Sequence, residues 1–122
     1  MGPFHALLRA PVIAERQLGW AEAISAAGLD PAACEVAILT VAGQWRAPCV
    51  LYAHSAAARG AGLSDDVVEG LVAARTPAGL DRAARLAHDV APALVRDQDV
   101  PDGLYGALLS EYGGRGPSSW SP

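Results

Sequence analysis

The stretch DPAACEVAILTVAGQWRAPCVLYAHSAAARGAGLS, residues 30–64, decides the fold of this chain. Asp30 followed by Pro31 has the pattern of a helix N-cap and first helical residue, which predicts a helix to about residue 44. Pro48 opens a second helix, which the glycines after Arg59 bring to an end. A turn over residues 44–47 would join the two helices into a central antiparallel hairpin.

Turn-forming residues divide the rest of the chain into further short helices. We expect helices over residues 3–10, 11–27, 65–75, 81–96 and 101–112. Pro92 falls inside the fourth of these and can kink it. The pattern shows no strand alternation, no internal repeat and no linker between domains. It predicts an all-α domain of about six or seven helices over residues 1–113, followed by an irregular Gly/Pro/Ser-rich tail over 114–122.

Composition and charge exclude several classes of function. The chain has 122 residues and a net charge of −4, so no basic surface indicates a nucleic acid or membrane partner. All nine basic residues are arginine, and the absence of lysine excludes Schiff-base mechanisms. We see no export signal and no apolar run that could span a bilayer, and we therefore expect a cytoplasmic protein with reduced cysteines. No cofactor-binding motif is present, and we expect no cofactor.

Glu35 and His54 are the acid and the imidazole best placed to meet inside this helical pair. In the hairpin, Glu35 on the first helix lies level with His54 on the second. A carboxylate that holds one ring N–H fixes the histidine tautomer and makes the other nitrogen more basic, as in general-base sites. The alternative is a partly buried histidine with one structural hydrogen bond. Spacing alone leaves both interpretations open.

Three segments give the chain a wider resemblance: GPFHALLRAPVIAERQLGW (2–20), EVAILTVAGQWRAPCVLYAHSAAARGAGLSDDVVEGL (35–71) and DRAARLAHDVAPALVRDQDVPDGLYGALLSEYG (81–113). The three segments resemble the carboxymuconolactone decarboxylase family and its alkylhydroperoxidase D-like relatives. The resemblance extends from about Pro3 to Tyr112, about nine-tenths of the chain. The resemblance implies an alkylhydroperoxidase D-like helical fold and a homo-oligomer, with trimers or hexamers the usual forms.

The peroxidase branch of this family uses a Glu, a CxxC pair and a His three residues after the second Cys. In this chain those positions fall on Glu35, Ala47, Val50 and His54, so both thiols are missing. Their absence argues against disulfide-forming peroxide reduction. Cys49 lies about 140° around the helix from His54, and we interpret it as a packing or contact residue. Peroxidase-type activity through Cys49 alone is the least favoured hypothesis.

The decarboxylase branch carries an "EW..H" motif at the same point, where this chain reads Val50-Leu51-Tyr52-Ala53-His54. The resemblance then implies a pocket formed by Ala47, Val50, Tyr52 and Trp45, with Thr40 near its rim. It implies cofactor-free acid/base chemistry, either decarboxylation or turnover of a lactone or small organic acid, with His54 catalytic and Glu35 orienting it. The alternative is a catalytically degenerate oligomeric scaffold or binding module.

The remaining candidates carry weaker signals. Arg46 beside the hairpin turn could bind a substrate carboxylate, or it could solvate the loop, which we favour. His5 and His88 are interpreted as surface or packing residues. The three histidines are too far apart in sequence to predict a metal site.

The end of the chain departs from the family pattern, because a further closing helix would be expected after Tyr112. A change of reading frame is one explanation, since a shifted frame through PSSWSP can encode Ala-Val-Glu-Leu-Val-Ala. A natural terminus or an expression boundary is the other. Loss of such a helix would expose apolar surface and favour self-association.

Overall fold

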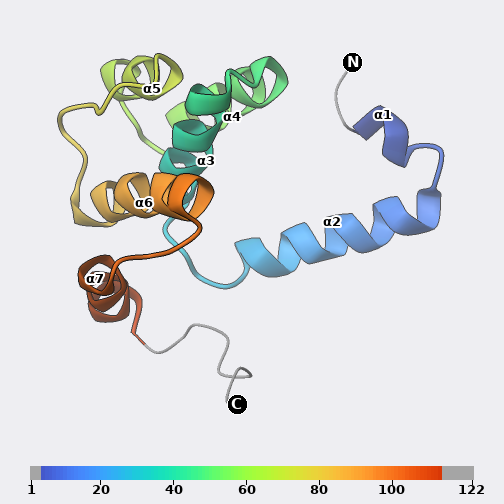
Figure 1. Ribbon diagram of the computed structural model, residues 1–122. Coiled ribbons are helices and arrows are strands. Elements are labelled where there is room, and N and C mark those ends of the chain that lie inside the picture. The colour runs from blue at the N-terminus through green and yellow to red at the C-terminus, as the bar shows by residue number, and fades with distance from the viewer. Residues whose placement is uncertain (1–3, 114–122) are drawn as a thin grey trace. The chain divides into compact units, whose positions relative to one another are not determined.

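The computed structural model describes residues 4–113, and these contain helices and no strand (Figure 1). The all-α prediction is confirmed. Within this range the seven α-helices and one π-helical turn are α1 (Phe4–Leu7), α2 (Pro11–Ser25), α3 (Pro31–Trp45), α4 (Pro48–Gly60), α5 (Asp65–Val72), α6 (Arg82–Pro92), η1 (Ala93–Asp97) and α7 (Asp102–Tyr112). None of these helices is long and apolar enough to cross a membrane. The irregular tail expected over residues 114–122 lies outside the described residues.

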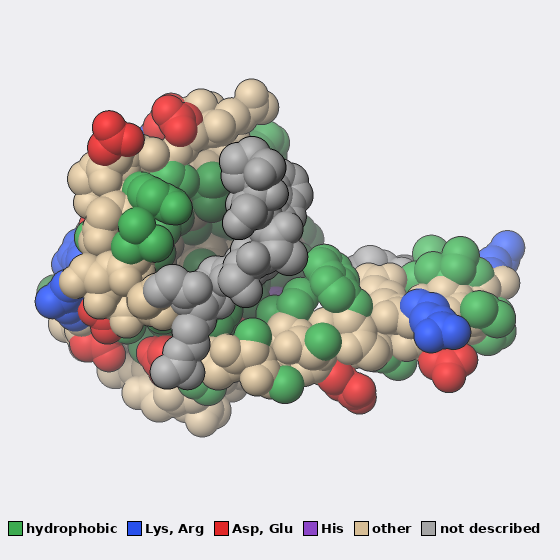
Figure 2. Space-filling view, turned by 90° about the horizontal axis from the view of Figure 1, so that it is seen from below, with side chains coloured by type: hydrophobic (Ala, Val, Ile, Leu, Met, Phe, Trp, Pro, Cys, Tyr) green, Lys and Arg blue, Asp and Glu red, His purple; other side chains and the backbone are tan. Residues whose placement is uncertain are grey.

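The chain divides into two compact units, Met1–Asp30 and Pro31–Pro122. The first contains α1 and α2, which contact each other. No residue of α2 is buried, and its large apolar side chains are exposed: Val12, Ile13, Leu18, Trp20 and Ile24. Figure 2 shows hydrophobic side chains spread over the surface of this unit. Within the first unit, α2 buries no face, so packing inside this unit stabilises the helix little.

The second unit is built around α3, which packs most extensively on α6 and also contacts α4 and α5 (Figure 1). α7 packs on α6. The core is a cluster of small and medium apolar side chains from α3 to α6: Val36, Leu39, Ala58, Val67, Val68, Leu71 and Ala84. Small residues let the helix axes approach closely, as the Ala-rich sequence indicates.

Helix starts follow the local sequence signals. Pro31 and Pro48 are the first residues of α3 and α4, as predicted. The Asp81 carboxylate accepts a hydrogen bond from the Ala84 N–H at 2.8 Å, which caps α6. The Ser64 hydroxyl similarly accepts from the Val67 N–H at 3.4 Å at the start of α5. These caps satisfy backbone donors that the first turn leaves unpaired.

Several predicted helices are shorter than the sequence pattern indicated; those expected over residues 3–10 and 11–27 are Phe4–Leu7 and Pro11–Ser25. The helix expected over residues 65–75 ends at Val72. The helix expected over 81–96 is α-helical to Pro92 and then continues as the π-helical turn η1. Proline lacks the N–H that would bond the carbonyl of His88, and its ring crowds that carbonyl. The helix nevertheless stays α-helical to Pro92, and the wider π-helical turn follows it at Ala93–Asp97, which differs from the simple kink expected at Pro92.

Gly43 marks the closest approach of α3 to the end of α5. A Cβ at this position would collide with the backbone carbonyl oxygen of Leu71. Gly43 is buried, and the colliding atom belongs to backbone that cannot rotate away. The two helices can lie this close only because residue 43 has no side chain.

Candidate active site

Glu35 on α3 and His54 on α4 form a direct contact. The distance between His54 Nδ1 and Glu35 Oε2 is 2.8 Å. The side chains are 34% exposed for His54 and 17% exposed for Glu35, so the pair is sheltered but open to solvent on one side. The structure brings together the two residues that the hairpin register predicted would meet.

The direction of this hydrogen bond determines what His54 can do. An ionised carboxylate only accepts, so Nδ1 of His54 carries the hydrogen that it donates to Glu35. In the neutral ring, Nε2 then holds the free lone pair. Glu35 thus orients the ring and leaves Nε2 as the nitrogen that can take up or deliver a proton.

A wholly apolar cleft of about 540 Å³ lies between α3, the start of α4 and the end of α6 with η1. Its lining residues are Ala37, Ile38, Val41, Ala42, Trp45, Ala47, Val50, Ala91, Leu94 and Val95. A cleft of this size is within the range of small-molecule sites, which are mostly apolar with a few polar groups. It offers a hydrophobic wall and no polar side chain of its own.

The Glu35–His54 pair adjoins this cleft by helix register. Val50 in the wall lies four residues before His54 on α4, and Ile38 lies three residues after Glu35 on α3. Residues three or four apart share a helix face. The pair therefore continues the cleft-facing side of both helices by about one turn, and it supplies the polar groups that the cleft lacks.

Of the predicted pocket residues, Ala47, Val50 and Trp45 line the apolar cleft. Tyr52 and Arg46 are not among its lining residues. Tyr52 is 87% exposed, and Arg46 is the residue with positive φ (48°) between α3 and α4.

Sequence reasoning missed the wall that α6 and η1 contribute, namely Ala91, Leu94 and Val95. These residues carry no chemical signal. Their apolar spacing was visible, but which face of α3 they cover depends on how α6 crosses α3.

A second, polar cleft of about 300 Å³ involves the opposite flank of the α3–α6 contact. It takes in Thr40, expected at the rim of the first pocket, and His88, expected to be a surface or packing residue. The His88 side chain is only 13% exposed, and its Nδ1 lies 2.9 Å from Asp89 Oδ1. The Thr40 hydroxyl is buried and donates to the Val36 carbonyl at 2.7 Å.

No disulfide joins Cys34 to Cys49, and Cys49 is exposed. Among residues 4–113, no three His, Cys, Asp or Glu side chains gather as they would around a metal ion.

Comparison of this chain with protein-family models, with curated proteins and with solved structures found no match. The Glu35–His54 pair and the two clefts are therefore the observations on which a function rests.

Proposed function

We propose that this protein is a cofactor-free acid/base catalyst that acts on a small organic acid or lactone. His54 is the catalytic acid/base and Glu35 is its positioning residue. The observation that carries this proposal is the 2.8 Å contact between His54 Nδ1 and Glu35 Oε2 beside a wholly apolar cleft. A sheltered imidazole with a fixed tautomer is the group that proton transfer near neutral pH requires.

Decarboxylation illustrates the chemistry. The substrate carboxylate leaves as CO₂, and the electron pair of the broken C–C bond moves onto the neighbouring carbon. Protonated His54 supplies the proton that this carbon takes up. The ring then regains a proton from solvent, which reaches it because a third of the side chain is exposed. The apolar wall favours loss of charge from the carboxylate, since it solvates CO₂ better than an anion.

We also propose a relationship to the carboxymuconolactone decarboxylase family, with the alkylhydroperoxidase D-like arrangement of helices. The support is the resemblance of the three segments quoted above, the all-helical structure of residues 4–113, and the pairing of Glu35 with His54 at the family's positions. Ala47 and Val50 line the cleft where the peroxidase branch has thiols. The absence of these thiols favours acid/base chemistry over redox chemistry. The alternative is a scaffold that has lost catalysis.

A ligand panel monitored by NMR tests the proposal. We expect nitrogen spectra of His54 to show the Nδ1–H tautomer, and small unsaturated acids or lactones to shift the His54 ring together with Val50 and Ile38. His5, an exposed histidine of the first unit, serves as the internal control and should not shift. If no member of a chemically broad panel perturbs His54, the catalytic proposal fails and the scaffold alternative is favoured.

We propose that the chain forms a homo-oligomer, a trimer or hexamer, in the cytoplasm. The support is the exposed apolar surface of α2, including Ile13 at 61% and Trp20 at 67% exposure.

Size-exclusion chromatography with light scattering tests the assembly. The expected mass is three or six times the chain mass of 12.5 kDa. Ile13→Glu should lower the assembly order, because it introduces a charge that would be desolvated in the interface. Glu22→Gln, a one-unit charge change at an exposed position about 180° around the same helix from Ile13, is the matched control and should leave the mass unchanged. A monomer at micromolar concentration would contradict the proposal.

A further inference from the structure

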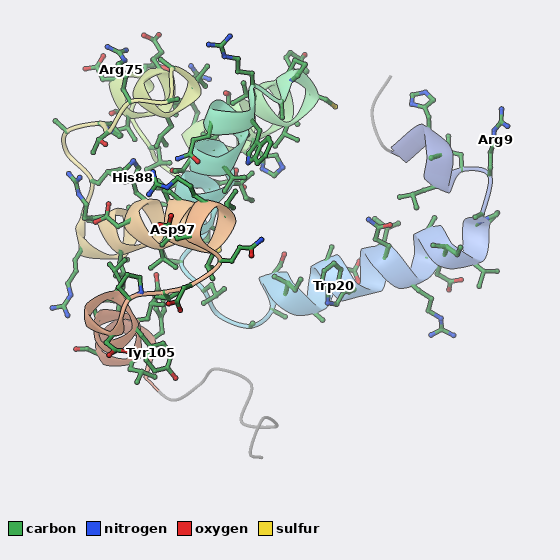
Figure 3. The ribbon with its side chains drawn as sticks, in the orientation of Figure 1. Arg9, Trp20, Arg75, His88, Asp97 and Tyr105 are labelled. Carbon is green, nitrogen blue, oxygen red and sulfur yellow. The ribbon has the colours of Figure 1, made fainter. Side chains whose placement is uncertain are left out.

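The polar cleft beside α3 has the chemistry of an anion site. It has a volume of about 300 Å³ and is lined by Thr40, Gln44, Leu71, Ala74, Arg75, Thr76, His88, Asp89, Pro92 and Arg96. Three parts of the chain contribute: the second half of α3, the end of α5 with the residues after it, and α6 with η1. Figure 3 shows Arg75 coming from the segment after α5 and His88 from α6. The cleft belongs to the second unit and shares no lining residue with the apolar cleft.

Positive charge predominates in this cleft. Arg75 makes no ion pair within residues 4–113. Arg96 contacts Asp97 through Nε at 3.5 Å, which leaves its two terminal nitrogens available. The single carboxylate in the lining, Asp89, is engaged by His88. The lining therefore holds two guanidinium groups and one carboxylate that already has a hydrogen-bond partner, although the whole chain is acidic.

Hydrogen-bond donors complete the lining. The Gln44 amide and the Thr76 hydroxyl are exposed side chains at the cleft and can donate to an anion. Guanidinium groups bind carboxylate and phosphate oxygens through paired N–H donors. Two arginines from separate elements, with amide and hydroxyl donors between them, fit a ligand that carries several oxygens.

The π-helical turn helps to bring Arg96 into this set. His88, Pro92 and Arg96 are four residues apart, and each such step in an α-helix moves the side chain by about 40° around the axis. A π turn holds more than four residues, so the step from Pro92 to Arg96 moves back towards the face of His88. The π turn thus places a second cation, Arg96, on the side of the helix that faces the cleft.

We propose that the polar cleft binds a small anion through a phosphate or carboxylate group held between Arg75 and Arg96, with Gln44 and Thr76 as additional donors. This site is separate from the Glu35–His54 pair. It would hold an effector or a second ligand, and the proposal stands whether or not His54 is catalytic.

Titration of the full chain tests the site. Sodium phosphate and sodium succinate are added separately at an ionic strength held constant with sodium chloride, and binding is followed by calorimetry and by amide NMR spectra. We expect saturable binding of at least one anion, with shifts clustered at Gln44, Thr76 and Arg96. Phosphate binding alone identifies a phosphate site, succinate binding alone a carboxylate site, and both a general oxyanion site.

Charge-removing variants locate the anion. Arg75→Gln and Arg96→Gln should each weaken binding by about tenfold or more, since each removes charge-assisted hydrogen bonds. Arg59→Gln removes the same charge from α4, where Arg59 pairs with Asp65, and should bind within about twofold of the native protein. His54→Gln should bind phosphate unchanged, which separates this site from the catalytic proposal. Non-saturable shifts, or an equal loss in Arg59→Gln, would overturn the site itself.

Discussion

Replacing His54 with glutamine is expected to lower kcat/KM for any substrate turned over beside the apolar cleft by about 100-fold to 10,000-fold. This range is the usual contribution of a positioned general acid/base. Glutamine keeps a donor that can reach the Glu35 carboxylate, but it cannot exchange a proton near neutral pH. The fold should tolerate the change, because residue 54 is one-third exposed and glutamine can keep the hydrogen bond to Glu35.

The companion variants separate catalysis from positioning. Glu35→Gln should lower kcat more than it raises KM, because the amide can donate to Nδ1 and so favour the wrong ring tautomer. The loss of the Nδ1–H tautomer in nitrogen NMR spectra would accompany this effect. His5→Gln, the same substitution at an exposed histidine, should leave both constants unchanged.

Steady-state kinetics on a substrate found with the ligand panel provide the measurement, and thermal unfolding reports whether each variant is folded. Turnover by folded His54→Gln at the native rate would remove His54 from the mechanism. An equal loss of kcat/KM in His5→Gln would show that the effect does not come from the Glu35–His54 site.

Replacing Gly43 with alanine is expected to destabilise the second unit, with a net loss of about 1–2 kcal/mol in the free energy of unfolding. The added Cβ would collide with the Leu71 carbonyl oxygen, and α3 and α5 would have to move apart. Overpacking of this kind costs about 1–3 kcal/mol. The better helix propensity of alanine offsets up to about 1 kcal/mol of that cost.

Gly106→Ala is the matched control in α7. A Cβ at Gly106 meets nothing within 4 Å, so only the propensity term remains and the variant should gain about 0.5–1 kcal/mol. The two substitutions are chemically identical and should have opposite signs in denaturant unfolding. If Gly43→Ala were also stabilising, the close approach of α3 to α5 would be wrong. Any perturbation of the core should also disturb the Glu35–His54 contact, because α3 carries both Gly43 and Glu35.

Much of the candidate site could be predicted because it depends on local helix-start signals and on which residues of the α3–α4 hairpin lie level with each other. Pro31 and Pro48 set the starts of α3 and α4, and the short turn between them makes the helices neighbours. Once two adjacent helices run antiparallel, residues at equal distances from the turn lie level with each other. The meeting of Glu35 and His54 follows from that geometry and from no long-range contact.

The parts that sequence reasoning missed depend on α6. The wall of the apolar cleft at Leu94 and the inclusion of His88 in a polar cleft both require the position of α6 on α3, about forty residues away in sequence. Pro92 gave a visible signal, and a kink was the expected response. The structure instead has a π-helical turn directly after Pro92, and the sequence pattern gave no signal for it.

The sequence by itself determined that the chain is helical, where most helices start, and that residues 30–64 bring Glu35 beside His54. Those features depend on proline, capping residues and helical periodicity, which act within a few residues. Only the tertiary structure decided that α3, α4, α6 and η1 enclose an apolar cleft, whose lining residues Ile38 and Val50 lie one helix turn from this pair, and that Arg75 and Arg96 share a polar cleft. A cleft is formed by side chains from distant segments, and its position depends on which helix faces pack together. Local sequence signals therefore do not determine which helix faces pack together or where the two clefts form.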